Sequence, residues 1–220
     1  MCGRYGLVPG KNFDERFDIE NRQEPLSPQY NVAPGSTMPV VVRNSPNHVA
    51  LMKWGLIPHW SKEPRVKFST INARAETVST SPTYRTPFRS RRCLVPASGF
   101  YEWQATKDGK QPYFIHLKDE SLFAFAGLYD VWRDDEGKEL LTYTIITTTP
   151  NSLMAPIHNR MPVILKREDE DVWLDKEADT ERLLSLLAPY PAEGLEAYPV
   201  SRAVNNPANE GEELIEPEAR

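Results

Sequence analysis

The chain is divided into short apolar runs separated by clusters of turn-forming residues, and few segments show the 3.6-residue period of an amphipathic helix. Apolar runs at residues 38–43 and 49–56 flank the sequence Asn-Ser-Pro-Asn, which favours a turn, so the two runs are predicted to form a β-hairpin. Short turns favour antiparallel pairing of the strands that they connect. Further strands are expected at residues 93–103, 113–117, 122–132, 140–148 and 198–200.

Helices are expected to be few, short and peripheral. Asn12 is placed as the cap of a helix over residues 12–18, and two further helical patterns cover residues 169–174 and 180–187. The twenty prolines suit irregular connections better than long helices, because proline fixes φ and removes a backbone N–H donor. The pattern predicts an α+β fold on a curved antiparallel sheet or open barrel, as one domain over residues 1–220 with its core at about 2–215.

Composition narrows the class of protein. Of the 220 residues, 40% are hydrophobic, which is enough for a buried core, and no run approaches the roughly 18 apolar residues of a membrane span. The first residues lack the regions of a signal peptide, so a cytoplasmic protein is expected. No metal, other cofactor or disulfide framework is expected, because four scattered histidines and two cysteines show no ligand spacing. The second cysteine, Cys93, is assigned to the sheet interior.

Charge is sorted along the chain although the net charge is only −5. The segment between Trp60 and Arg92 is rich in basic residues, and two interpretations of it stay open. It is either a solvated basic face, or a surface that binds a nucleic acid by stacking on its bases and neutralising its phosphates. An acidic tail at about residues 209–220 is interpreted as a solvated face. The basic stretch contains Lys62, Arg65, Lys67, Arg74, Arg85, Arg89, Arg91 and Arg92 against Glu63 and Glu76, with aromatic residues Trp54, Trp60, Phe68, Tyr84 and Phe88 in or beside it.

The second residue of the chain, Cys2, has distinctive chemical potential. Removal of Met1 would place an α-amine and a thiol on neighbouring carbons, with reference pKa values of about 7.7 to 8.0 and about 8.5. An aldehyde can form an imine with such a pair and then close to a thiazolidine ring. The alternative is that Cys2 is incidental, since a small second residue also invites routine removal of the initiator methionine.

Three internal motifs add candidate chemistry. Asn72, Arg74 and Glu76 alternate, so an extended backbone would project all three from one face; a salt bridge between Arg74 and Glu76 is the alternative. Glu102 lies within an aromatic strand, where a carboxylate is either paired or raised in pKa, as suits a general acid or base. His158 follows a predicted strand in a proline-bracketed loop, which suits proton transfer and equally a structural hydrogen bond.

Seven motifs occur in order over nearly the whole chain, from Cys2 to about Ile215. They are Met-Cys-Gly-Arg at 1–4, Tyr-Asn-Val-Ala-Pro-Gly at 30–35, Trp-Gly-Leu at 54–56, Ile-Asn-Ala-Arg-Ala-Glu at 71–76, Gly-Phe-Tyr-Glu-Trp at 99–103, Ile-His-Asn-Arg-Met-Pro at 157–162 and Pro-Val-Ser-Arg at 199–202. Together they closely resemble the SOS response-associated peptidase (SRAP) family. The resemblance implies a single barrel-like α+β domain that removes its own Met1, binds single-stranded DNA at abasic sites and captures the abasic aldehyde covalently.

The resemblance also implies roles for individual residues. Cys2 would be the nucleophile, Glu102 the acid and base, and His158 the group that assists sugar opening and elimination. Asn72 would hold the sugar hydroxyl or the linkage. The implied DNA-binding residues are Arg4, Arg74, Asn31 and Trp60, with Arg4 and Arg74 on phosphates and Glu76 orienting Arg74. Either Trp60 or an apolar wedge near Pro58 would occupy the gap left by the lost base.

Two rival functions remain open at this point. The first is a thiol peptidase that acts on other proteins through Cys2, His158 and Glu102. The second is a non-catalytic module that binds single-stranded DNA. For the favoured function the expected partners are abasic single-stranded DNA and the replication machinery, with no membrane contact, and a monomer is expected. A location at the nucleoid or the replication machinery, an abasic lyase activity, protection of damaged DNA during replication and a role in the SOS response are further expectations from the resemblance.

Overall fold

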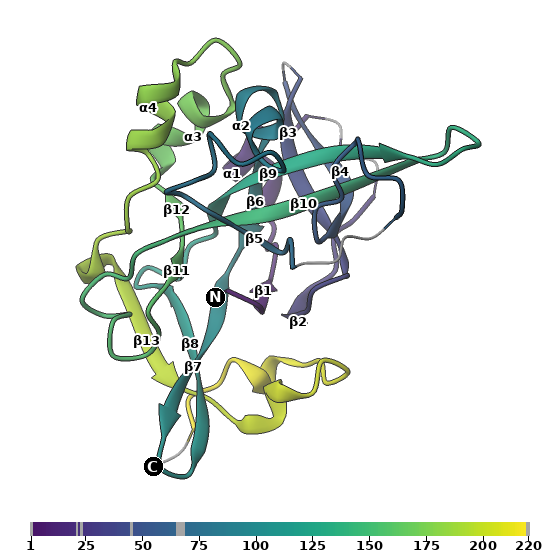
Figure 1. Ribbon diagram of the computed structural model, residues 1–220. Helices are drawn as coiled ribbons and strands as arrows, with labels where there is room; N and C mark the ends of the chain where they lie inside the picture. The colour runs from purple at the N-terminus through teal and green to yellow at the C-terminus, as the bar shows by residue number, and fades with distance from the viewer. Residues whose placement is uncertain (1, 21, 23, 45, 65–68, 219–220) are drawn as a thin grey trace.

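The computed structural model describes residues 2–20, 22, 24–44, 46–64 and 69–218, and Figure 1 shows its ribbon. The strands are β1 (Tyr5–Leu7), β2 (Gln29–Val32), β3 (Thr37–Arg43), β4 (Asn47–Trp54), β5 (Asn72–Arg74), β6 (Arg92–Ala97), β7 (Gly99–Thr106), β8 (Gly109–Leu117), β9 (Phe123–Arg133), β10 (Glu139–Thr148), β11 (Met161–Pro162), β12 (Ile164–Leu165) and β13 (Leu195–Pro199). The helices are α1 (Phe13–Phe17), α2 (Arg85–Ser90), α3 (Arg167–Leu174) and α4 (Thr180–Ser185), with three 3₁₀ turns at Ala192–Gly194, Arg202–Asn205 and Glu212–Leu214.

The larger sheet has eight strands and closes on itself. Its ring runs β10, β4, β3, β6 and β9, and β9 pairs again with β10, while β5 and β11 add to β10 and β12 adds to β9. The predicted hairpin is present as β3 and β4, and most pairs are antiparallel as expected. Two pairs differ, because β4 and β5 run parallel to β10. Figure 1 shows the long β9–β10 hairpin reaching to the right of this ring.

The smaller sheet has five antiparallel strands in the order β13, β8, β7, β1 and β2. Its middle strand is β7, and the short β1 fits between β7 and β2. In Figure 1 this sheet lies below the ring, with the β7–β8 hairpin extending toward the bottom of the view. The α+β class with a barrel-like sheet and few short helices is therefore confirmed.

The apolar run at residues 93–103, predicted as one strand, forms two strands in different sheets. β6 belongs to the ring and β7 to the smaller sheet, and the chain passes between them at Ser98. The Ser98 hydroxyl accepts a hydrogen bond from the Val8 backbone N–H at 2.7 Å. Gly99 allows the close approach that follows, since a Cβ there would lie 2.2 Å from the Phe114 ring. The same run therefore joins the two sheets and carries Glu102 to the junction.

Three of the four α-helices lie where the pattern predicted them, and α2 was not predicted. Asn12 occupies the N-cap position of α1, but its side chain makes no capping hydrogen bond. α2 is a six-residue helix whose sequence, Arg-Thr-Pro-Phe-Arg-Ser, is too short to establish a 3.6-residue period. The side chain of Trp173 in α3 donates to the Cys93 carbonyl at 3.0 Å, which fixes this helix on β6.

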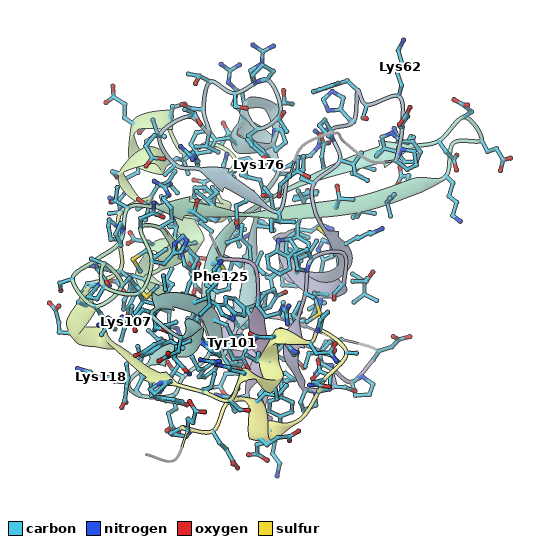
Figure 2. All side chains as sticks on the ribbon, turned by 60° about the horizontal axis from the view of Figure 1, so that its bottom comes forward. Lys62, Tyr101, Lys107, Lys118, Phe125 and Lys176 are labelled. Carbon is cyan, nitrogen blue, oxygen red and sulfur yellow. The ribbon has the colours of Figure 1, made fainter. Side chains whose placement is uncertain are left out.

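The core fills the ring and continues between the two sheets. Figure 2 shows Phe125 within the molecule, whereas Lys62 and Lys118 lie at its outer edge, and Phe125 is fully buried. Cys93 is fully buried too, in agreement with its assignment to the sheet interior. Edge-to-face contacts join Phe125 to Tyr5, with ring centroids 5.9 Å apart, so the N-terminal strand is part of this core.

The C-terminal acidic segment packs against the smaller sheet. Its glutamates are exposed, as expected for a solvated face, but Leu214 is buried in a cluster with Tyr101 and Phe114. The Glu210 carboxylate accepts hydrogen bonds from the backbone N–H groups of Tyr30 at 2.8 Å and Asn31 at 3.2 Å. The segment thus covers the outer edge of β2, which would otherwise present unpaired backbone donors.

Candidate active site

Cys2 lies three residues before the start of β1 and is fully buried. β1 is held on both sides, because Tyr5 pairs with Phe100 of β7 and with Val32 of β2. This place between β7 and the edge strand β2 fixes the backbone next to Cys2. Met1, whose removal the resemblance implies, lies outside the described residues.

Glu102 comes from β7, and its side chain is almost completely buried, with 2% of the residue exposed. Burial raises the pKa of this carboxyl group, because a charge is poorly solvated in the apolar junction, and the nearby His158 acts in the opposite direction. The His158 Nδ1 atom lies 3.9 Å from Glu102 Oε1. The sequence-based expectation of a paired or raised carboxyl group is therefore confirmed.

The same surroundings shift the pKa of the Cys2 thiol. Burial raises the pKa of this thiol, the charge of Glu102 raises it further, and the Arg4 backbone N–H lowers it. In this environment the thiol holds its proton at neutral pH. Chemistry at Cys2 therefore needs an acceptor for that proton, and Glu102 is close enough to affect the thiol electrostatically.

His158 lies in the loop after β10, as predicted, and the backbone of this loop holds it. Its backbone N–H donates to the Met154 carbonyl at 2.8 Å. The ring Nδ1 accepts from the Arg160 N–H at 3.0 Å and also lies 3.1 Å from the Arg160 carbonyl oxygen. The first contact suits a neutral ring with its proton on Nε2, and the second suits a protonated Nδ1. The loop thus supplies a hydrogen-bond partner for Nδ1 in either tautomer of the ring, which suits a proton-transfer group.

A cavity of about 350 Å³ opens beside these groups. It is lined by Glu102, Trp103, Lys110, His158 and Asn205. The Trp103 indole donates to Asn205 Oδ1 at 2.7 Å, so the 3₁₀ turn at Arg202–Asn205 fixes one wall. The cavity joins residues that are far apart in the sequence, and it gives a ligand access to Glu102 and His158.

Asn72 belongs to β5, next to Ile145 of β10. Its Nδ2 donates a long hydrogen bond of 3.4 Å to the Ile145 carbonyl, and its buried Oδ1 has no hydrogen-bond partner among the described residues. The Tyr84 hydroxyl donates to the Asn72 carbonyl at 3.1 Å, and burial raises the pKa of Tyr84 to about 12. Asn72 is thus a fixed residue with an acceptor to offer, although no described contact joins it to Cys2.

Glu76 forms its ion pair with Arg160 and, among the described residues, makes no salt bridge with Arg74, although the charge of Arg74 also helps to lower the pKa of Glu76. Its carboxylate binds both terminal nitrogens of Arg160, with Nη2 at 3.0 Å from Oε2, and this pairing lowers the pKa of Glu76. The physical reason is that β5 ends at Arg74 and the chain then turns, so strand alternation does not reach Glu76. Arg160 Nη2 also donates to the Thr147 carbonyl at 2.6 Å. The pair therefore ties the His158 loop to the turn after β5.

Arg4 and Asn31 bind one another and the C-terminal part of the chain. Arg4 Nη1 donates to Asn31 Oδ1 at 2.6 Å and to the Val204 carbonyl at 2.8 Å. Asn31 is 2% exposed, and its Nδ2 donates to the carbonyls of Asn206 and Asn209 at 3.0 and 2.9 Å. Asn31 is therefore a buried structural anchor in this conformation, and Arg4 is half-buried with its guanidinium 6.0 Å from the Trp103 ring.

A family model described as SOS response associated peptidase matches residues 1–207. The chain belongs to the SRAP family. Among its relatives, the abasic site processing protein YoqW of Bacillus subtilis (strain 168) is 47% identical over 224 residues, covering 98% of this chain and 99% of YoqW. The abasic site processing protein HMCES of Gallus gallus is 36% identical over 263 residues, covering 99% of this chain and 78% of HMCES.

A solved SRAP-like fold supports the architecture independently. The crystal structure of a protein from Bacteroides thetaiotaomicron matches this SRAP chain with a TM-score of 0.80 at 34% identity, covering 87% of this chain and 86% of that one. In sequence, the abasic site processing protein YoaM of Bacillus subtilis (strain 168) is 44% identical over 226 residues, and the alignment covers 99% of this chain and 99% of YoaM. Fold and family therefore agree with the expectation drawn from the seven motifs.

The basic stretch of this SRAP protein is organised differently from the predicted stacking surface. Trp54, Tyr84 and Phe88 are buried in the core, so of the aromatic side chains expected there Trp60, at 54% exposed, is the one at the surface among the described residues. Arg92 is buried as well and donates to main-chain carbonyls. The exposed cations of the stretch include Lys62, Arg74, Arg85 and Arg89, whereas Arg65, Lys67 and Phe68 lie outside the described residues.

Metal-binding clusters and membrane-spanning helices are two further features that this SRAP fold could contain. In the described ranges, no three His, Cys, Asp or Glu side chains are grouped in a way that could hold a metal ion. In the same ranges, no helix has the length and apolarity needed to cross a bilayer. Lys110, Trp103 and Asn205 were not singled out from the sequence; of these, Trp103 belongs to the recognised motif at 99–103, which is the one available signal.

Proposed function

We propose that this SRAP protein processes abasic sites in single-stranded DNA, by forming a covalent link between Cys2, freed of Met1, and the aldehyde of the opened sugar. The observation that carries the proposal is a buried thiol close enough to feel the charge of Glu102, a buried carboxyl group of raised pKa that lines one cavity together with the loop histidine His158. The names of the relatives, all abasic site processing proteins, support the same substrate.

The chemistry balances without a cofactor. The new N-terminal amine of Cys2 attacks the aldehyde carbon and gives a carbinolamine, which loses water to form an imine. The thiol sulfur then adds to the imine carbon while its proton passes to the imine nitrogen, and a thiazolidine ring results. One water is released for each link formed, and no oxidant or reductant is consumed.

Proton transfer is the task of Glu102 and His158. A closed abasic sugar exposes no aldehyde, so its ring oxygen must be protonated and its anomeric hydroxyl deprotonated before capture. Glu102, with its raised pKa, can donate a proton to the carbinolamine oxygen and then accept one from the Cys2 thiol. His158 lines the same cavity and can move protons on the sugar. Asn72 supplies a fixed acceptor for a sugar hydroxyl.

The test is a denaturing gel of the purified protein mixed with three single-stranded oligonucleotides. One carries a single abasic site, one carries the same site reduced with borohydride so that it has no aldehyde, and one is undamaged. A heat-stable shifted band is expected with the first oligonucleotide alone. Absence of that band from protein whose intact mass shows loss of Met1 would overturn the proposal.

The same preparation separates the rival functions. A peptidase acting on other proteins would turn over an unrelated fluorogenic peptide, and the proposed function expects no such turnover. A simple binding module would retain all three oligonucleotides on a native gel in a salt-dependent manner, with no band surviving denaturation.

Arg74→Ala is expected to weaken binding of single-stranded DNA to a similar degree for all base sequences. Arg74 is exposed at the end of β5, and a phosphate contact carries no base information. For one phosphate contact, the slope of log affinity against log salt should fall in magnitude by about 0.7. Fluorescence anisotropy with homopolymeric and mixed oligonucleotides measures both quantities. A loss confined to one base sequence would contradict a phosphate contact.

A further inference from the structure

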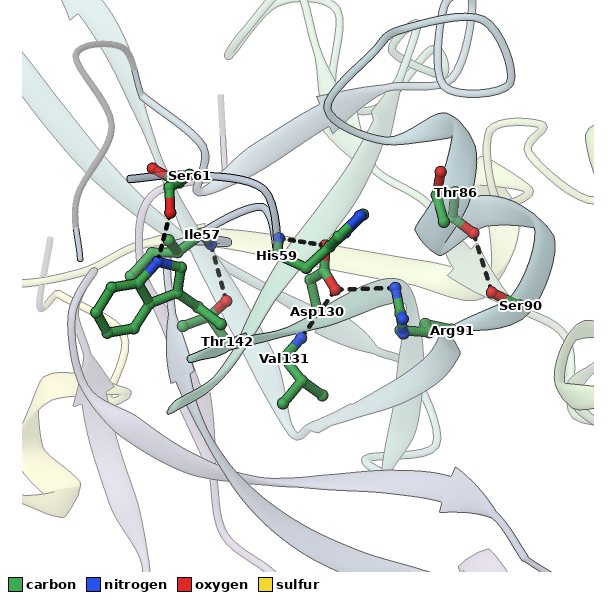
Figure 3. A network of polar contacts seen from close by, with 10 residues as sticks. Ile57, His59, Ser61, Thr86, Ser90, Arg91, Asp130, Val131 and Thr142 are labelled. Atoms are coloured by element: carbon green, nitrogen blue, oxygen red, sulfur yellow. Dashed lines mark hydrogen bonds and ion pairs between the residues drawn. The ribbon is translucent and has the colours of Figure 1, made fainter. Parts of the chain in front are cut away.

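A buried carboxylate, Asp130 of β9, lies outside the site described so far. It is completely buried and has four hydrogen-bond donors around it. Oδ2 accepts from the His59 backbone N–H at 2.9 Å and is 3.0 Å from His59 Nδ1. Oδ1 accepts from Arg91 Nη1 and the Val131 backbone N–H at 2.9 and 2.8 Å. Figure 3 shows Asp130 between His59 and Arg91.

These contacts fix the loop at residues 55–61, here named the Trp60 loop. Three further hydrogen bonds hold the same loop: the Gly55 N–H donates to the Tyr143 carbonyl at 2.8 Å, the Ile57 N–H to Thr142 Oγ1 at 2.8 Å, and the Trp132 indole to the Ser61 carbonyl at 2.8 Å. The loop is therefore attached to β9 and β10 on both sides of its tip.

The tip itself is left in solvent. Trp60 is 54% exposed although both of its neighbours in sequence are bonded to the sheet. A long polar network that served only to bury the loop would cover this large apolar side chain. Here the network holds the backbone still and keeps the indole outside, which is the arrangement of a preorganised contact residue.

The surroundings of Trp60 indicate what it contacts. Arg91 keeps 31% of its side chain exposed while it binds Asp130, and Lys62 extends outward at the edge of the molecule (Figure 2). An exposed aromatic ring that lies two positions from Lys62 in sequence, in a loop joined to Arg91 through Asp130, suits a base of a single strand, whose face stacks on the ring while its phosphates meet the positive charges.

We propose that Asp130 is a positioning residue for DNA binding: it fixes the Trp60 loop so that the Trp60 ring is preset to stack against the single strand at the lesion. This inference rests on the proposed function and adds a residue that touches neither the substrate nor Cys2. Because Asp130 acts through Trp60, removing either residue removes the same interaction, and removing both costs no more than removing Trp60.

The test is a double-substitution cycle on covalent capture of abasic single-stranded DNA. Asp130→Asn, Trp60→Ala, the double variant and wild type are compared for the half-saturating DNA concentration and for the capture rate at saturation. Asp134→Asn is the matched control, because Asp134 binds only backbone N–H groups of its own turn among the described residues. A melting curve of each variant accompanies the kinetics.

Trp60→Ala is expected to raise the half-saturating concentration by about 5- to 150-fold, the range for loss of one base–aromatic stack, with the saturating rate unchanged. Asp130→Asn should give a rise of at least about fivefold, the double variant should match Trp60→Ala, and Asp134→Asn should match wild type. Additive effects of Asp130 and Trp60, or a normal half-saturating concentration for Asp130→Asn, would overturn the inference.

Thr142→Val keeps the experiment decisive if Asp130→Asn fails to fold. It removes the acceptor of the Ile57 N–H and loosens the same loop from β10. The same coupling to Trp60 is expected, and additivity would again count against preset stacking. Wild-type protein that captures no abasic DNA would instead disprove the proposed function, so the two failures are told apart.

Discussion

Cys2→Ala is expected to reduce the heat-stable crosslink with abasic single-stranded DNA to the level seen with undamaged DNA. The substitution leaves an α-amine but removes the sulfur, so an imine can form and hydrolyse while ring closure cannot occur. Non-covalent binding should stay close to that of wild type, because Cys2 is fully buried and makes no surface for the strand. A denaturing gel measures the first quantity and anisotropy in rising salt the second.

The second cysteine provides the matched control. Cys93 is also fully buried, but on β6 of the ring. Cys93→Ala should crosslink at the wild-type rate although it removes a core thiol of the same size. Equal loss in both variants would mean that the effect comes from packing, and retention of the crosslink in Cys2→Ala would exclude Cys2 as the attachment point.

Glu102→Gln is expected to slow crosslinking by about 10²- to 10⁴-fold, the usual contribution of a positioned acid or base. Glutamine preserves shape and hydrogen bonding but cannot exchange the proton that ring closure requires. If Glu102 also drives self-processing, intact mass should show Met1 retained in protein made in a cell-free system without aminopeptidase. When the single-turnover crosslinking rate is plotted against pH, the change in rate that reflects ionisation of the Glu102 carboxyl group should also disappear.

The same variant has a distinct stability signature. Because burial raises the folded-state pKa of Glu102, the folded protein binds this proton more tightly than the unfolded chain does. The contribution of this proton to the free energy of unfolding is fully present below the unfolded-state pKa of about 4.3. It is lost as pH rises through the higher folded-state pKa. Glutamine does not ionise, so Glu102→Gln should melt at a higher temperature than wild type at pH 8, with the difference disappearing near pH 4. A difference that is constant with pH would contradict a raised pKa.

Local patterns predicted the parts of this structure that local sequence determines. The β3–β4 hairpin follows from two apolar runs around a turn, and Glu102 stood out because a carboxylate interrupts an aromatic strand. β1 and β5 have three residues each, too few to establish a period of two; β1 was missed, and β5 was considered only as a segment that could be extended. Their positions depend on partners such as β7 and β10, which lie far along the chain.

The sequence-based predictions that differ from the structure also share a cause. Arg74 and Glu76 are near in sequence, but the partner of Glu76 is Arg160, 84 positions away, because the strand ends between them. Trp54 and Phe88 looked like possible stacking residues until their burial was known. Asp130 was hidden in an apolar run, and its role appears only when β9 meets the Trp60 loop. Long-range pairing decides each of these cases.

The way β1 is held sets the order in which this protein becomes competent during synthesis. Residues 2–7 leave the ribosome before the segments that hold them, because β1 pairs with β7, about a hundred residues later, and Arg4 binds the Val204 carbonyl, 200 residues along the chain. A nascent chain therefore carries Cys2 for most of its synthesis without Glu102 or His158 beside it. The candidate site is therefore complete only after Val204 has been synthesised, so products truncated before it carry an unassembled site.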